Sequence, residues 1–187
     1  DHSGDVVAGH VRERRRLRQP GGQPEIHVVE RGCTDRDPDL AGAGDRVTLE
    51  MKAGVIPVEA SGSVWTLQAN PPKHRAPQAS CETFAAMLGL DAADIGTAPL
   101  WVDTGSDQLV IPLASFDAVR RAAPRPGAML AHATIGTRSM AYVFAREEDR
   151  VLARFFFLKH GSLVEDPGTG SACANLGGWL LATGAAL

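Results

Sequence analysis

The chain has 187 residues and a formal net charge of −3; 44% of its residues are hydrophobic and 22% are charged. This composition is that of an ordinary globular protein and excludes wholesale disorder. The slight acidity gives no electrostatic reason to expect nucleic acid or an anionic membrane surface as a partner. No run of about 18 apolar residues is present, so no membrane-spanning helix is expected.

The cysteine pattern indicates a reducing compartment. Cys33, Cys81 and Cys173 are odd in number and contain no close pair, which indicates neither a disulfide framework nor a Cys-x-x-Cys metal site. The first residues also lack the basic and then apolar build of a signal peptide. These features favour the cytoplasm.

Residues 1–45 differ in character from the rest of the chain. Five arginines are crowded between Arg12 and Arg18, a Gln-Pro-Gly-Gly run follows, and only residues 25–30 have the pattern of a strand. The charge and the Pro/Gly content predict a divergent or disordered lead segment. A basic nucleic-acid patch is the alternative, but no aromatic residue is interleaved to stack on bases.

Residues 46–97 form the remainder of a predicted N-terminal half. The runs 47–51, 55–59 and 64–69 predict an antiparallel meander, which ends at Asn70-Pro71-Pro72. A helix then begins after Ser80, a favourable N-cap residue, and ends at Gly89. Glu82 is expected on the solvated face of this helix.

Residues 98–187 form the predicted C-terminal half. The runs 99–102 and 108–113 flank a polar turn, 115–119 predicts a short helix, and 140–145 and 151–157 flank the charged turn 146–150. The order of strands, helix, strands and helix lacks the regular alternation of a parallel sheet. We therefore predict an α+β protein with antiparallel sheets.

A glycine-rich turn from Asp166 to Ser171 leads into the last predicted helix. The first N–H groups of a helix have no intrahelical partner and the helix dipole is positive there, so such a terminus attracts an anion. Gly168 and Gly170 let the backbone approach a carboxylate or phosphate, and Thr169 and Ser171 supply hydroxyl donors. Asp166 lies beside that anion and suits proton transfer. The spacing by itself favours an ordinary N-cap and turn before a core helix, because glycine-rich turns before helices are common.

The helix after this turn is apolar nearly all round, which predicts burial on every side. Gly177 and Gly178 lie side by side within it and predict the close approach of other backbone. Cys173, in the same helix, is predicted to pack as a small hydrophobic residue.

The run EDPGTGSACANLGGWL, residues 165–180, resembles the hallmark segment of PhzF-like proteins, the phenazine-biosynthesis isomerase family of the diaminopimelate epimerase-like superfamily. The segments LEMKAGVIPVE, WTLQANPP, LWVDTGSDQLVIPL, MAYVFA and RFFFLKHG resemble family segments in the same order, so the resemblance covers residues 46–187. It implies a two-domain diaminopimelate epimerase-like fold, here incomplete, in which curved antiparallel sheets each surround a central helix.

The resemblance also implies an activity. Family members of this type are isomerases that move a proton on a small carboxylated substrate, without a metal or organic cofactor, in phenazine-type biosynthesis. Asp166 would then line the active site, and Gly170 and Ser171 would help to hold the substrate carboxylate. Family members are often dimers, so a homodimer is expected.

Two family features are altered or missing in this sequence. Ala8-Gly9-His10 is similar to the Gly-His-Pro motif of the family, which makes His10 a candidate catalytic residue, although Val11 replaces the proline. The principal acid/base glutamate of the family lies in a Glu-Thr-x-Phe segment, upstream of everything recognisable here, so inactivity of the chain as given is one expectation. Residues 81–84 look similar, but they fall in a predicted surface helix, and we interpret the likeness as coincidence.

Two other interpretations stay open. Related epimerases carry a cysteine immediately before Gly-Thr-Gly, and Pro167 has that place here, which disfavours a racemase or epimerase of the same fold. A non-catalytic small-acid binding protein would keep the anion-binding turn without the acid/base glutamate.

Overall fold

The computed structural model describes residues 27–31, 46–51, 54–61, 64–148 and 150–185. These described residues divide between Pro71 and Pro72 into two compact units, which are described separately. Within the described ranges, no helix combines the length and the apolar character needed to cross a membrane. The predicted halves, residues 46–97 and 98–187, remain a prediction.

The smaller unit contains a four-stranded sheet in the order β1-β4-β3-β2, with every neighbouring pair antiparallel. This confirms the meander predicted over residues 47–69 and the strand predicted within residues 25–30. Its strands are β1 His27–Arg31, β2 Arg46–Met51, β3 Gly54–Ser61 and β4 Val64–Gln68.

The larger unit contains a seven-stranded sheet in the order β11-β10-β9-β7-β6-β5, with β8 paired to β9. Both predicted hairpins are confirmed: β6 pairs with β7 and β9 pairs with β10, each antiparallel. The strands are β5 Lys73–Arg75, β6 Leu100–Asp103, β7 Asp107–Pro112, β8 Thr134–Ile135, β9 Arg138–Glu147, β10 Arg150–Lys159 and β11 Ser162–Asp166.

Helix α1, Cys81–Leu88, confirms the helix predicted after Ser80. The Ser80 hydroxyl accepts a hydrogen bond from the N–H of Thr83, and Gly89 ends the helix in the left-handed conformation with φ 69°, which glycine adopts without steric cost. Glu82 is exposed, as predicted. The other helices are the 3-10 helix η2 Ala92–Asp94, α2 Phe116–Arg121, α3 Pro126–His132 and α4 Gly170–Thr183.

One strand pair corrects the prediction of antiparallel sheets. Strands β7 and β9 are parallel. The segment between them contains α2 and α3, and it carries the chain back to the end of the sheet at which β7 begins. Helix α3 was not predicted. Pro126 stands at the start of α3, where proline is favourable because its missing N–H would have no partner anyway.

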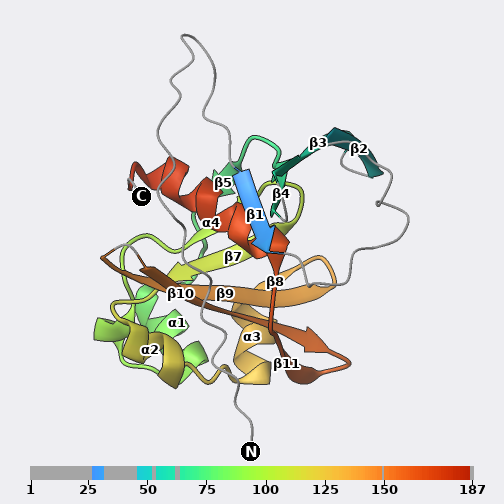
Figure 1. Ribbon diagram of the computed structural model, residues 1–187. Helices are drawn as coiled ribbons and strands as arrows, with labels where there is room; N and C mark the ends of the chain where they lie inside the picture. Colours follow the sequence, from blue (N-terminus) through green and yellow to red (C-terminus); the bar gives the residue numbers. More distant parts are fainter. Residues whose placement is uncertain (1–26, 32–45, 52–53, 62–63, 149, 186–187) are drawn as a thin grey trace, which may run out of the picture. The chain divides into compact units, whose positions relative to one another are not determined.

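The sheet of the larger unit has helices on both faces. Figure 1 shows α1, α2 and α3 on one side of β9 and β10 and α4 on the other. Along β7, Leu109 and Ile111 join the apolar cluster of α1, α2 and α3, while Val110 between them joins the cluster of α4. This alternation is the two-residue period of a strand that is covered on both faces.

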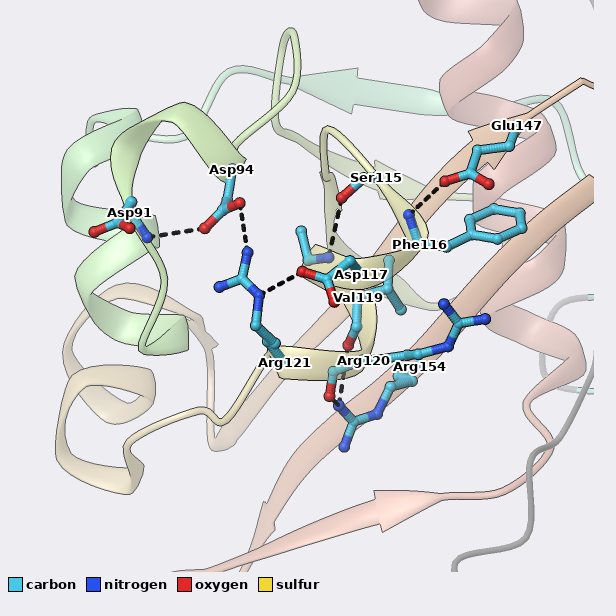
Figure 2. A network of polar contacts seen from close by, with 11 residues as sticks. Asp91, Asp94, Ser115, Phe116, Asp117, Val119, Arg120, Arg121, Glu147 and Arg154 are labelled. Carbon is cyan, nitrogen blue, oxygen red and sulfur yellow. Dashed lines mark hydrogen bonds and ion pairs between the residues drawn. The ribbon is translucent and has the colours of Figure 1, made fainter.

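Two arginines fix α2 to its surroundings (Figure 2). Arg154 of β10 donates to the carbonyls of Val119 and Ala122 at 3.0 and 2.8 Å, and it also pairs with both carboxylate oxygens of Glu165. A cation at the end of a helix complements the helix dipole. Arg121 joins Asp94 of η2 at 2.8 Å to Asp117 at 2.7 Å.

Candidate functional site

Asp166 ends β11, and α4 begins four residues later, at Gly170. Its half-buried carboxylate accepts hydrogen bonds from the N–H of Gly168, at 3.2 Å, and from the Thr169 hydroxyl. These two contacts fix the direction of the carboxylate relative to the turn. An ionised carboxylate has about four acceptor positions, so two donors leave it capable of further contacts.

The N-terminus of α4 has no side-chain cap. Thr169 is the N-cap residue, but its hydroxyl donates to Asp166 instead of accepting from the helix backbone. The first-turn N–H groups of Gly170 and Ser171 therefore keep their capacity to donate, at the positive end of the helix dipole. The turn brings Asp166, Gly168, Thr169, Gly170 and Ser171 together, with the Thr169 hydroxyl already engaged.

A buried polar network supports this N-terminus, and the sequence prediction missed it. Asn175 of α4 is fully buried; its Oδ1 accepts from the N–H and the hydroxyl of Thr104, and its Nδ2 donates to the Ser106 carbonyl and to Gln108 Oε1. Gln108 Nε2 donates to Ser171 Oγ at 3.1 Å. The sequence did contain a signal for this network. Gln108 and Asn175 each lie in an apolar segment, and an amide that is buried there needs hydrogen-bond partners.

Gly178 lets α4 lie close to the sheet. A Cβ atom at this position would stand 2.8 Å from Val102 Cγ1 and 2.9 Å from Pro72 Cβ, which is closer than real contacts allow. The predicted close approach is confirmed at Gly178, but the atoms it meets belong to side chains and not to the backbone. Trp179 follows, with its indole N–H donating to the Ala98 carbonyl at 2.8 Å.

The prediction that α4 is buried on every side is wrong in this structure. Ser171 and Cys173 are exposed, and Leu181 is 40% exposed, because α4 packs on one face of the sheet and its outward side remains accessible. Cys173 is therefore not the packed hydrophobic residue that was predicted. Its Sγ lies 3.7 Å from the hydroxyl of Tyr142, and burial raises the pKa of that phenol.

His10 lies outside the described residues. Among the described residues, no three His, Cys, Asp or Glu side chains gather closely enough to hold a metal ion. A separate hollow of about 450 Å³ is lined by residues that include Arg75, Trp101 and His132. It contains none of the predicted site residues.

The family model for phenazine biosynthesis-like proteins, PhzC-PhzF, matches residues 37–186. The chain therefore belongs to this family. The match begins upstream of residue 46, where the resemblance was expected to start.

One similar protein sequence comes from a bacterium. An uncharacterized isomerase from Pasteurella multocida is 40% identical over 101 residues, which are 54% of this chain and 34% of the relative. The chain thus matches about a third of that relative's length.

Solved structures share the fold. A PhzF-family phenazine biosynthesis protein from Bacillus anthracis has a TM-score of 0.61 and 18% identity, over 76% of this chain and 51% of that one. A predicted epimerase from Pseudomonas aeruginosa has a TM-score of 0.56 and 22% identity, over 79% of this chain and 54% of that one. These matches confirm an α+β protein whose structure corresponds to about half the length of each solved relative.

Proposed function

We propose that this protein is a cofactor-independent PhzF-like isomerase that transfers a proton by acid/base catalysis on a small carboxylated substrate, in phenazine-type biosynthesis. The observation that carries the proposal is the N-terminus of α4, which has no side-chain cap and lies directly after the Asp166 carboxylate. Family membership and the names of the relatives, one an isomerase and one a predicted epimerase, support the reaction class.

In the proposed mechanism, the substrate carboxylate accepts hydrogen bonds from the N–H groups of Gly170 and Ser171 and from the Ser171 hydroxyl. This interaction orients the substrate, and the positive end of α4 stabilises the negative charge that develops when a carbon acid loses its proton. Asp166, held by Gly168 and Thr169, relays a proton between two positions of the same substrate.

Three further features belong to the proposal. His10 would act as a second catalytic group, and the complete protein would adopt the two-domain fold of the superfamily, with a central helix in each half. A homodimer in the cytoplasm is the expected form. Each of these features stays a prediction.

The test uses an intact parent protein that also carries the upstream Glu-Thr-x-Phe segment. Its substrate is dihydro-hydroxyanthranilate, the substrate of the phenazine enzyme that this chain resembles. Turnover is measured in D₂O by NMR, both as isomerisation and as deuterium incorporation at carbon. Asp166→Ala and Asp166→Asn should each lower the rate by roughly 10²- to 10⁴-fold, the usual contribution of an acid/base group. Glu165→Gln is the matched control. Its carboxylate belongs to the same strand and pairs with Arg154 beside α2, so its removal should leave the rate within about twofold of the unaltered protein.

The outcomes separate the three interpretations. Full activity of folded Asp166→Ala would refute the catalytic role of Asp166. Deuterium incorporation at one stereocentre without migration of a double bond would indicate an epimerase. Binding of the substrate without any deuterium incorporation would indicate a small-acid binding protein.

A further inference from the structure

Two backbone groups determine which end of the Asn175 amide accepts a hydrogen bond and which end donates one. Asn175 Oδ1 lies 3.0 Å from the N–H of Thr104, which can only donate. Asn175 Nδ2 lies 2.7 Å from the carbonyl of Ser106, which can only accept. The side-chain amide of Asn175 therefore has one orientation that satisfies both partners.

The orientation of the Asn175 amide in turn determines the orientation of the Gln108 amide. Asn175 Nδ2 also donates to Gln108 Oε1 at 2.8 Å, so the oxygen of the Gln108 amide is the acceptor. Only Nε2 of Gln108 then remains to face Ser171 Oγ, 3.1 Å away, and this nitrogen can only donate. Gln108 is 3% exposed, so water has little access to compete for its amide.

Ser171 is the exposed end of this chain of contacts. A hydroxyl has one proton and two lone pairs. Because Gln108 donates to the Ser171 oxygen, the interior uses one lone pair, and the hydroxyl proton is left to point toward the outside of α4. The buried network thus determines which kind of partner the hydroxyl can take.

We propose that Gln108 and Asn175 are positioning residues, which hold the Ser171 hydroxyl as a hydrogen-bond donor to the substrate carboxylate. This inference rests on the proposed function and extends it to the origin of carboxylate specificity. An acceptor with negative charge meets a hydroxyl that is already oriented to donate, whereas a ligand without a carboxylate gains less from that orientation.

The test compares two ligands by calorimetry on the whole chain. The probe is 3-hydroxyanthranilate, and the control ligand is 2-aminophenol, the same ring without the carboxylate. Gln108→Glu preserves the shape of the side chain but reverses its hydrogen bond with Ser171. The glutamate carboxylate can only accept, so it accepts from both Asn175 and the Ser171 hydroxyl and turns that hydroxyl inward. Gln108→Met is a neutral second variant, in case the buried charge of glutamate prevents folding.

We expect Ser171→Ala to weaken binding of 3-hydroxyanthranilate roughly tenfold, as for the loss of one hydrogen bond to a charged group. Gln108→Glu should weaken binding by at least as much, and Gln108→Met by a few-fold. In the Ser171→Ala background, Gln108→Met should have no effect and the effect of Gln108→Glu should shrink about tenfold, leaving only charge repulsion. Binding of 2-aminophenol should stay within about twofold throughout.

A role of Gln108 in folding alone would weaken both ligands equally or leave both unchanged. The inference is overturned if Ser171→Ala weakens the carboxylate probe while both Gln108 variants leave its Kd unchanged, or if the effects of Gln108 and Ser171 simply add. Equal binding of the two ligands by the unaltered protein would instead overturn the proposed carboxylate site, and this inference with it.

Discussion

The two faces of the seven-stranded sheet are built differently. The face toward α1, α2 and α3 is closed by an apolar cluster that includes Phe84, Met87 and Ile111. The face toward α4 combines an apolar cluster with the buried amides of Gln108 and Asn175. A buried amide lowers the stability of a fold unless all of its donors and acceptors are hydrogen-bonded, whereas an apolar group stabilises the fold by burial alone. From this comparison we expect that the first face mainly supplies stability and that the second positions the proposed site.

The largest expected effect tests the apolar face. Phe84 of α1 is completely buried, so Phe84→Ala should lower the free energy of unfolding by about 3–5 kcal/mol through lost burial and a cavity. Binding of 3-hydroxyanthranilate by the protein that remains folded should not change. Urea unfolding and calorimetry check the two expectations, and a selective loss of binding would contradict the division between the faces.

A substitution among the buried amides on the face toward α4 should change both the free energy of unfolding and the affinity for 3-hydroxyanthranilate. Asn175→Ala leaves the Thr104 N–H and the Gln108 amide without their partner, which should cost roughly 2–4 kcal/mol of unfolding free energy. Unlike Phe84→Ala, it should also weaken the carboxylate probe in the folded protein. Unchanged affinity, with reduced stability, would make Asn175 a structural residue only.

The close contact of α4 is tested at Gly178. Gly178→Ala introduces a Cβ atom against Val102 and Pro72, and we expect a loss of about 1–3 kcal/mol from overpacking. Gly127→Ala is the matched control, since nothing lies within 4 Å of a Cβ at that position in α3. The control should be neutral or stabilising by up to about 1 kcal/mol. Equal effects of the two substitutions in thermal unfolding would show that α4 is not closely packed.

The smallest effect concerns acid stability on the apolar face (Figure 2). A hydrogen bond from Arg121 lowers the pKa of Asp94 below its ordinary value of 3.8. The folded-state pKa is thus below the unfolded value, so this contact stabilises the protein above about pH 4 and is lost as the pH falls through the folded-state pKa. Asp94→Asn should therefore flatten the decline of stability below pH 4. An unchanged acid unfolding curve would show that the contact contributes nothing in solution.

The sequence predicted what depends on neighbouring residues. Alternating runs and polar turns gave the hairpins β6–β7 and β9–β10, and Ser80 and Gly89 marked both ends of α1. The turn between Asp166 and α4 was also visible, because glycines before an apolar helix form a local pattern.

The rest depended on contacts between distant segments. The parallel pairing of β7 with β9 follows from the path of the whole crossover, and the local pattern of either strand does not contain it. Gln108 and Asn175 lie 67 positions apart in sequence, so only the packing of α4 on the sheet brings their amides together. The exposure of Cys173 likewise depends on which face of α4 meets the sheet.

The most direct test of the central claim is an amide NMR titration of the protein with 3-hydroxyanthranilate, with 2-aminophenol as the control. We predict that the backbone amides of Gly170, Ser171 and Ala172 shift with the carboxylate ligand and stay in place with 2-aminophenol. Shifts confined to the hollow beside Arg75 and His132, or equal shifts with both ligands, would contradict a carboxylate site at the N-terminus of α4.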